Sequence, residues 1–240
     1  MIRTVLKERI TNNSMIPFMV KNEDTKQAVK QTMQLEGFFP TPIGFVQMDK
    51  TLNKKILEIN KIKQFKFRKN FGGGGNDVSS DLYILDKDEL SDIKKVLTDS
   101  VNEYFKEIVN PDKDMKLYIT NSWINVNKNG ESHHAHKHTN SIVSSVLYID
   151  THEGDTITFL NPNDNLFGNL KIGNNTTMWD SNEWTIPTKN NILIMFPSTL
   201  THAVSARPNT CTGTRISLSF NTWFKGTIGC GEGSPDQLCL

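Results

Sequence analysis

Cysteine is scarce in this sequence. The 240 residues include three cysteines, Cys211, Cys230 and Cys239, and no two of them form a CxxC pair. An odd number of cysteines without such a pair predicts neither a disulfide framework nor a zinc knuckle. We therefore expect the protein to work in a reducing compartment.

Long apolar runs are missing as well. No stretch approaches the roughly 20 apolar residues of a membrane-spanning helix. The segment from Met1 to Arg9 has no apolar run of the kind that a signal peptide needs. Hydrophobic residues make up 36% of the chain and charged residues 22%, as in a soluble globular protein. These features predict a cytoplasmic protein without a membrane partner.

The chain carries almost no net charge. A formal charge of +1 gives no global field that would steer the protein onto nucleic acid or an anionic membrane. One local basic patch, interleaved with Phe65 and Phe67, comprises Lys61, Lys63, Lys66, Arg68 and Lys69. We interpret it as a solvated helix end that runs into a half-buried strand. A nucleic-acid partner is therefore not expected.

Four consecutive glycines, Gly72 to Gly75, suggest a phosphate-binding loop at first sight. The run lacks the Lys-Ser/Thr pair that follows the glycines of such a loop, and it lacks the spacing of a dinucleotide fingerprint. Nucleotide binding is thus not indicated. We predict a flexible loop, which can act as a lid if it lies over a pocket.

Residues 1–114 have the patterns of helices and irregular connections. The clearest helix follows Asp86, because apolar residues recur at steps of three and four until Asn110-Pro111 ends the pattern. Weaker helical patterns cover residues 25–35 and 52–62. We expect this region to support the rest of the chain. The apolar positions of the clearest helix are Leu90, Ile93, Leu97, Val101, Phe105 and Ile108.

Residues 115–225 consist of short runs rich in β-branched and aromatic residues. Turn residues such as Asn129-Gly130 and Asn161-Pro162 separate the runs, which predicts an antiparallel sandwich or barrel. The predicted strands are residues 117–126, 141–149, 156–160, 184–186, 192–196 and 215–223. Residues 226–240 are predicted to form an irregular tail. No linker is long enough to separate independent domains, so one compact domain is expected.

Histidines cluster in this second region. Five of the six lie between His133 and His152, and the sixth, His202, follows a predicted strand. In an extended segment His134, His136 and His138 project from the same face, so two of them can bind one metal ion. A third ligand from a distant strand completes a facial set. Neutral imidazoles suit iron, copper, zinc or nickel, and a facial set with open positions suits dioxygen and a chelating co-substrate.

The predicted strand that begins at Arg215 has a polar face. Arg215, Ser217 and Ser219 alternate with Ile216, Leu218 and Phe220. An arginine that points inward is costly unless an anion meets it. Its planar fork matches a carboxylate, and the hydroxyl of Ser217 can donate to the same group. A structural ion pair explains Arg215 alone equally well, and the upstream histidines favour a ligand.

The order of these motifs resembles the 2-oxoglutarate/iron(II) oxygenase superfamily, most closely the oxygenases of marine bacteriophages and bacteria. The resemblance covers residues 115–225. It implies a mainly β fold, a double-stranded β-helix (jelly roll) with the N-terminal helices packed on its outer face. If a phage encodes the chain, the expected location is the host cytoplasm. The motifs are His136-x-His138, Tyr148, Gly154-Asp155, Asn161-Pro162, Phe196-Pro-Ser-x-x-x-His202 and Arg215-Ile-Ser-x-Ser-Phe-Asn221.

The resemblance also implies roles for individual residues. His136 and His202 correspond to ligands of Fe(II), and Arg215 with Ser217 corresponds to the pair that holds the far carboxylate of 2-oxoglutarate. Tyr148 stands where related enzymes often supply a phenol to that carboxylate. Three residues that share one face of the first core strand line the substrate pocket by analogy: Asn121, Trp123 and Asn125.

The chain departs from the superfamily at the remaining metal ligand. Most members have His-x-Asp or His-x-Glu, whereas this chain has His136-Lys137-His138. We predict that His138 replaces the carboxylate, which makes the iron site one unit more positive. Three alternatives stay open: His134 is the ligand in its place, a carboxylate such as Asp155 reaches the metal, or the site is weakened or inactive.

The implied activity is that of a dioxygenase. Such an enzyme uses dioxygen and 2-oxoglutarate to hydroxylate an unactivated carbon, with succinate and carbon dioxide as co-products. The expected substrate is peptidyl, including prolyl, or a small molecule. One rival is a cupin-like enzyme with three histidines that does not use 2-oxoglutarate and has no need of Arg215. The other is a non-catalytic β-sandwich module of a virion or binding component.

Overall fold

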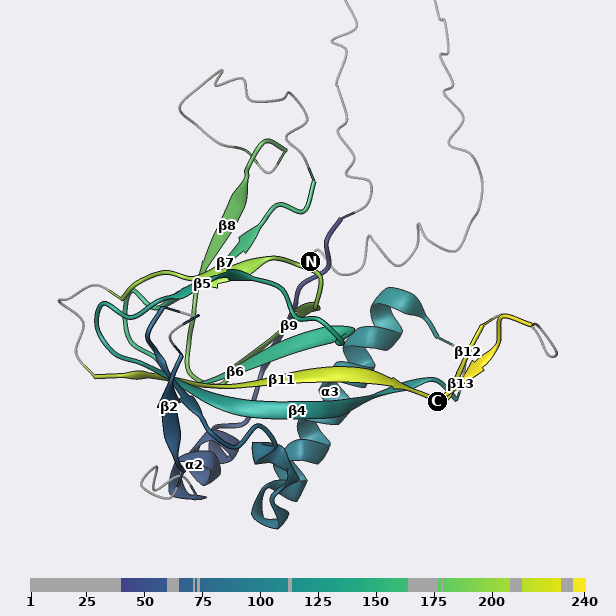
Figure 1. The fold of residues 1–240 in the computed structure, drawn as a ribbon, viewed down its shortest axis with the longest axis horizontal. Helices are drawn as coiled ribbons and strands as arrows, with labels where there is room; N and C mark the ends of the chain where they lie inside the picture. Colours follow the sequence, from purple (N-terminus) through teal and green to yellow (C-terminus); the bar gives the residue numbers. More distant parts are fainter. Residues whose placement is uncertain are drawn as a thin grey trace, which may run out of the picture. The chain divides into compact units, whose positions relative to one another are not determined.

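Strands dominate the structure (Figure 1). The computed structural model describes residues 40–59, 65–70, 72, 74–111, 114–163, 177, 179–207, 213–229 and 235–240, all within the compact unit 40–240. The predicted helix at residues 25–35, the basic residues Lys61 and Lys63, and the cysteines Cys211 and Cys230 lie outside the described residues. Cys239 is a free, exposed cysteine.

A sheet of seven strands forms the larger layer, and all its pairings are antiparallel. In spatial order the strands are β1 (Gly44–Gln47), β9 (Ile192–Pro197), β6 (Val143–Asp150), β11 (Arg215–Lys225), β4 (Lys116–Asn127), β3 (Asp77–Ser79) and β2 (Phe67–Lys69). A smaller antiparallel sheet consists of β5 (His133–His136), β10 (His202–Val204), β7 (Thr156–Leu160) and β8 (Glu183–Pro187). The predicted jelly roll is confirmed by this pair of sheets.

Helix α3 (Ser91–Val109) packs on the outer face of the larger sheet (Figure 1). It ends at Asn110, which adopts a left-handed conformation with φ 50° and donates its N–H to the carbonyl of Lys106. The helix after Asp86 is thus confirmed, and its buried face lies in one core with Leu218 and Phe220 of β11. Helix α2 (Lys50–Ile59) and the short turns η2 (Ile84–Asp86) and η3 (Asp88–Leu90) complete this layer.

Strict alternation along β11 separates two environments. Ile216, Leu218 and Phe220 join the core under the helices, whereas Ser217 and Ser219 face the other side. The polar side chains therefore lie between the two sheets, where the site is built. Among the described residues no helix is both long enough and apolar enough to cross a membrane.

Two parts of the chain differ from the expectation. The region predicted as helical support contributes three strands, β1, β2 and β3, to the larger sheet. These strands have three or four residues each, too few for a period of two to stand out in the sequence. The tail that was predicted to be irregular forms a two-stranded sheet from β12 (Thr227–Ile228) and β13 (Leu238–Cys239), which pair antiparallel.

Candidate metal centre

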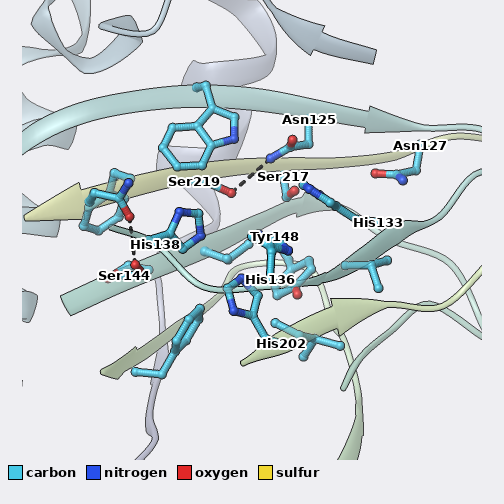
Figure 2. A pocket seen from close by; sticks show the side chains of 18 of the residues that line it. Asn125, Asn127, His133, His136, His138, Ser144, Tyr148, His202, Ser217 and Ser219 are labelled. Carbon is cyan, nitrogen blue, oxygen red and sulfur yellow. Dashed lines mark hydrogen bonds between the residues drawn. The ribbon is translucent and has the colours of Figure 1, made fainter. Parts of the chain in front are cut away.

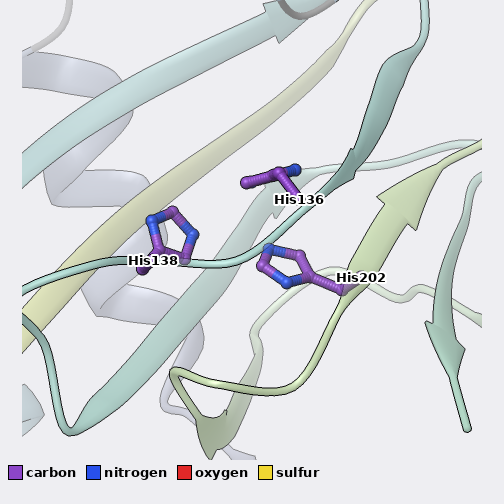
Figure 3. A group of neighbouring side chains, drawn as sticks. All are labelled: His136, His138 and His202. Atoms are coloured by element: carbon purple, nitrogen blue, oxygen red, sulfur yellow. The ribbon is translucent and has the colours of Figure 1, made fainter. Parts of the chain in front are cut away.

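Three histidines meet between the sheets (Figure 3). Each of His136, His138 and His202 offers a ring nitrogen, and these three atoms lie within 4.8 Å of one another. His136 ends β5 and His202 begins β10, and the two residues are direct partners in the antiparallel pairing of these strands. His138 follows β5, and its backbone N–H donates to the carbonyl of Ser198 at 3.1 Å. Strand pairing and this one loop contact therefore bring the three imidazole rings together.

Backbone carbonyls orient two of the three rings. Nδ1 of His136 lies 2.8 Å from the carbonyl oxygen of His134, and Nδ1 of His202 lies 3.1 Å from that of Leu200. A carbonyl oxygen only accepts hydrogen bonds, so Nδ1 carries the proton in both contacts. The lone pair is then on Nε2. This is the arrangement by which proteins present histidine to a metal ion.

Burial keeps these imidazoles neutral. Desolvation lowers the pKa of His202 to about 3 and that of His138 to about 4, and it lowers the pKa of His136 as well. Repulsion among the rings acts in the same direction, since the neighbouring histidines disfavour a second positive charge. Neutral imidazole is the metal-binding form, so the site is prepared to take a cation without first releasing protons.

Two other histidines of the cluster lie outside this set. His134 is exposed and is not among the three convergent side chains. His133 stacks on His136 with ring centroids 4.2 Å apart and lines the same pocket, but it does not join the convergent set. The structure thus brings together the histidines at 136, 138 and 202 and leaves the register alternative, His134, at the surface.

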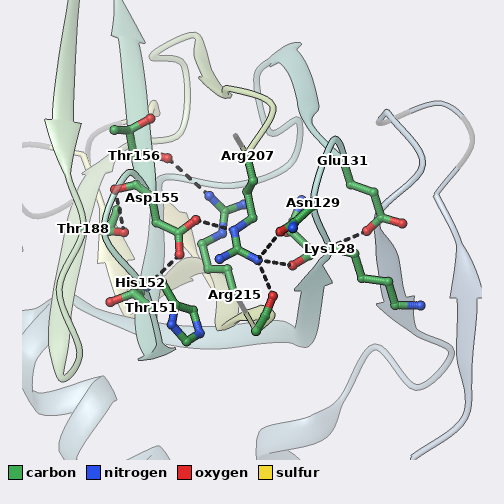
Figure 4. A network of polar contacts seen from close by, with 12 residues as sticks. Lys128, Asn129, Glu131, Thr151, His152, Asp155, Thr156, Thr188, Arg207 and Arg215 are labelled. Carbon is green, nitrogen blue, oxygen red and sulfur yellow. Dashed lines mark hydrogen bonds and ion pairs between the residues drawn. The ribbon is translucent and has the colours of Figure 1, made fainter. Parts of the chain in front are cut away.

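Asp155 is engaged elsewhere (Figure 4). Its Oδ1 accepts from Nε of Arg207 at 2.7 Å, and its Oδ2 accepts from the backbone N–H of His152 at 2.9 Å. Both partners of the ion pair are buried. A carboxylate held in this way is not available to the metal set, and Asp155 is absent from the convergent group.

Arg215 enters the pocket from β11. Its side chain is buried, Nη1 donates to the carbonyl of Thr156 at 3.3 Å, and Nε has no hydrogen-bond partner among the described residues. Burial lowers the pKa of Arg215, and Tyr148 and Asp155 oppose that effect. Since Asp155 is already paired with Arg207, the positive charge of Arg215 has no carboxylate of its own among the described residues. An anion is the natural occupant beside it.

His136, His138, His202 and Arg215 line one pocket. Figure 2 shows the three histidines on its wall. Tyr148, Ser217, Trp123 and Asn125 line it too. Burial raises the pKa of the Tyr148 phenol to about 12, so the group stays protonated and can donate. The sequence had also suggested Asn121, which is not among the lining residues. An irregularity in the pairing of β4 and β11 follows directly after its pair with Asn221.

Two functional-site residues were missed by sequence reasoning. Asn127 lines the pocket opposite Arg215 on β4, and its place two residues beyond Asn125 on the same face was a signal for it. Arg207 donates to the carbonyls of Gly213 and Asn127 and to Asp155. It lies in a loop without periodic pattern, so nothing in the sequence marked it.

A family model for putative 2OG-Fe(II) oxygenases matches residues 121–221. No protein of curated function matches the chain. Among solved structures, a prolyl-4-hydroxylase from Pseudomonas putida is 11% identical, with 75% of this chain and 92% of that chain covered and a TM-score of 0.51.

Two further structures share the fold. The α-ketoglutarate-dependent epimerase SnoN from nogalamycin biosynthesis is 12% identical, with coverage of 76% and 78% and a TM-score of 0.54. HygX from Streptomyces hygroscopicus, solved with nickel, 2-oxoglutarate and hygromycin B, is 8% identical, with coverage of 76% and 82% and a TM-score of 0.53. Residues 121–221, which carry the three histidines, Tyr148 and Arg215, are therefore the part of the chain that matches the 2OG-Fe(II) oxygenase family.

Proposed function

We propose that the chain is an Fe(II)- and 2-oxoglutarate-dependent dioxygenase that hydroxylates an unactivated carbon, with succinate and carbon dioxide as co-products. One observation carries the proposal: a convergent set of three neutral histidines lines the same pocket as a buried arginine, and this arginine has no carboxylate partner in the described part of the chain. A metal site alone needs no such arginine.

The donor set fits a divalent metal of the iron group. His136 and His202 each have Nδ1 occupied by a carbonyl and Nε2 free, and three imidazoles leave open positions for other ligands. When bound there, Fe(II) supplies the activation of dioxygen that hydroxylation of an unactivated carbon needs. His138 is our proposal for the third ligand, because it is the third member of the convergent set.

The Arg215 end of the pocket fits the far carboxylate of 2-oxoglutarate. Nε of Arg215 has no hydrogen-bond partner within the described ranges, and the planar guanidinium group matches the geometry of a carboxylate. Tyr148 contributes a protonated phenol and Ser217 a hydroxyl, so one charge and two neutral donors surround the same place. Arg207 and Asp155 neutralise each other, which leaves the positive charge of Arg215 for the ligand.

The remaining walls hold the reactants and exclude water. Phe196 and Ile157 are buried and line the pocket with the histidines. An apolar wall of this kind limits access of solvent and strengthens the contact of Arg215 with a carboxylate. The role of the protein in the reaction is therefore to orient the co-substrate and to keep the cavity dry.

We propose a peptidyl substrate, including prolyl, or a small molecule. Relatives of the same fold support both classes. One is a prolyl hydroxylase from Trichoplax adhaerens in complex with a peptide fragment, with a TM-score of 0.51, and another is HygX with hygromycin B bound. No carboxylate side chain lines the pocket among the described residues, so a strongly cationic reacting group has no partner there.

Turnover of 2-oxoglutarate to succinate, measured in the presence of Fe(II) without added substrate, tests the proposal. The wild type should form succinate, and Arg215→Ala should lower the rate at least tenfold while it retains iron. Arg68→Ala is the matched control, because Arg68 is an exposed arginine on β2 and should leave the rate unchanged.

The rival functions give other results. A cupin-like enzyme binds iron stoichiometrically and forms no succinate from 2-oxoglutarate. A non-catalytic module binds no iron, or binds it equally well in wild type, His136→Ala and His202→Ala. The exposed His134→Ala is the control for these variants and should retain wild-type iron.

A further inference from the structure

A glycine-rich hairpin, residues 70–76, connects β2 to β3. None of its described residues lines the pocket. The backbone N–H of Asn70 donates to the carbonyl of Asn76 at 2.8 Å, and Gly75 donates back to Asn70 at 3.0 Å. Two contacts nevertheless link this hairpin to the pocket, one through Gly74 and one through Asn76.

Gly74 lies against the start of the strand that carries His136. Its φ is +110°, and a Cβ added there would lie 2.6 Å from both the carbonyl oxygen and Oγ of Ser132. Only glycine allows this approach. Gly75 also forms an isolated bridge with Ser132, which directly precedes β5. The hairpin therefore supports the N-terminal end of β5, four residues before the first proposed metal ligand.

Asn76 reaches the pocket through a second residue. It is fully buried, and its Nδ2 donates to Oδ1 of Asn125 at 3.4 Å. Nδ2 of Asn125 in turn donates to Oγ of Ser219 at 3.0 Å, and Figure 2 shows this bond inside the pocket. Asn125 and Ser219 both line the pocket. A side chain of the hairpin is thus two hydrogen bonds away from a pocket hydroxyl.

The direction of the hydrogen bonds from Asn76 through Asn125 to Ser219, here called the relay, determines whether the Ser219 hydroxyl acts as a donor or an acceptor in the pocket. An amide has one accepting and one donating end, so Asn125, which accepts from Asn76, must donate to Ser219. Ser219 then uses its oxygen as an acceptor and keeps its own hydrogen for the pocket. Ser219 pairs across the sheet with Trp123, whose ring lies 5.7 Å from that of His138. Ser219 is therefore the strand partner of a residue whose ring lies beside His138, and its hydrogen is left for an acceptor in the pocket.

We propose that the glycine-rich hairpin positions the site, with Gly74 setting β5 and Asn76 turning the Ser219 hydroxyl toward an oxygen acceptor at the keto-acid end of 2-oxoglutarate. The inference rests on the proposed function for the identity of that ligand. Gly74 and Asn76 are positioning residues, since neither touches the pocket. Ser219 is the group that contacts the ligand.

Binding titrations test the two parts of the proposal separately. Titration with nickel, a redox-inert probe, tests the role of Gly74, and titration with 2-oxoglutarate tests the role of Asn76. Gly74→Ala should weaken nickel binding about tenfold. Gly72→Ala is its control, because a Cβ at Gly72 meets nothing within 4 Å, and it should bind nickel as the wild type does. Equal nickel affinities of these two variants would overturn the role of Gly74.

Asn76→Asp tests the relay without emptying the buried position. A carboxylate at 76 only accepts, so Asn125 must turn its amide N–H₂ toward it and its oxygen toward Ser219. Ser219 then donates to Asn125 instead of to the pocket. Asn76→Asp should weaken the binding of 2-oxoglutarate to the nickel-loaded protein three- to tenfold, with nickel affinity within twofold of the wild type.

Ser219→Ala should cause the same loss as Asn76→Asp, and the double variant should lose no more than either single variant. Unchanged 2-oxoglutarate affinity in Asn76→Asp, or fully additive losses, would contradict the relay. If the wild type binds neither nickel nor 2-oxoglutarate, the proposed function fails. The relay is then tested by the side-chain amide resonances of Asn125, which should shift in Asn76→Asp and stay in place in Gly72→Ala.

Discussion

Arg207 and Asp155 form a buried ion pair directly behind the pocket, with 2.7 Å between Nε and Oδ1 and side chains that are 1% and 0% exposed. The pair joins the loop that precedes β11 to the residue that precedes β7, and Arg207 also binds the carbonyls of Asn127 and Gly213. It therefore ties both sheets together at the Arg215 end of the pocket.

Removal of one partner of this pair should destabilise the protein strongly. Asp155→Ala leaves Arg207 as a buried charge without a counterion, and such losses cost about 3–5 kcal/mol. Urea unfolding of the two proteins measures the difference. Lys95→Ala is the control, because the Lys95–Asp99 pair is exposed and its loss should cost less than about 1 kcal/mol. Similar effects of the two substitutions would contradict the structural role of Asp155.

Arg215→Lys should retain the positive charge but lose the paired donor geometry that the guanidinium group offers to a carboxylate. An ammonium group cannot offer the two parallel donors of a guanidinium, so the affinity for 2-oxoglutarate should fall at least tenfold. Isothermal titration of the nickel-loaded variant measures this. Nickel affinity should remain as in the wild type, since Arg215 is not in the convergent histidine set. Wild-type affinity for 2-oxoglutarate would show that Arg215 acts only as a structural residue.

Tyr148→Phe should weaken 2-oxoglutarate binding by about ten- to a hundredfold, the loss expected for one hydrogen bond to a charged group. The pKa of Tyr148 is raised to about 12 by burial, so the phenol is a donor throughout the working range. The pH profile of wild-type 2-oxoglutarate affinity should thus show no change from Tyr148 ionisation between pH 6 and 9. Equal affinities of Tyr148→Phe and wild type would remove Tyr148 from the site.

The metal-free protein should lose stability in acid because of His202. Its pKa is about 3 in the folded protein against an ordinary 6.5, so between these values the unfolded chain binds more protons than the folded one. Stability should therefore be unaffected by this group above pH 6.5 and fall as the pH drops from about 6.5 to 3. The slope is up to about 1.4 kcal/mol per pH unit for one group.

Denaturant unfolding of the metal-free protein at several pH values measures this slope. His202→Gln removes the ionisable group. The slope of the unfolding free energy against pH should therefore fall by up to about 1.4 kcal/mol per pH unit, the contribution of one proton. The same slope in variant and wild type would mean that His202 does not stay neutral in the folded protein.

His138→Asp tests the proposed third ligand. A carboxylate at 138 restores the set common in the superfamily, so the variant should bind iron and form succinate, whereas His138→Ala should lose iron affinity at least tenfold. Atomic absorption after dialysis against a weak chelator measures the bound iron. Iron retention in His138→Ala equal to that of the wild type would exclude His138 as a ligand.

Much of this site can be predicted from the amino-acid sequence alone. The alternation Arg215, Ser217, Ser219 on β11 follows from the period of two in a strand, and the structure has all three in the pocket. The order of motifs along residues 115–225 predicted the jelly roll. Helix α3 was predicted because its apolar residues repeat at the helical period. These features depend on local spacing, which a sequence contains directly.

Other features depended on contacts between distant segments. The sequence left His134, His138 and Asp155 as alternatives, because spacing alone does not show which ring meets His202. The pairing of β5 with β10 and the contact of His138 with Ser198 bring His138 together with the rings on these two strands. Asp155 forms an ion pair with Arg207 instead. The bulge beside Asn121 and the approach of Gly74 to Ser132 have no local signal either. The long strands of residues 115–225, their polar faces and the kinds of ligand thus follow from the sequence alone, whereas short strands such as β5 and β10 do not. The tertiary structure decided which of these groups meet, since strand register and loop packing arise from contacts across the whole chain.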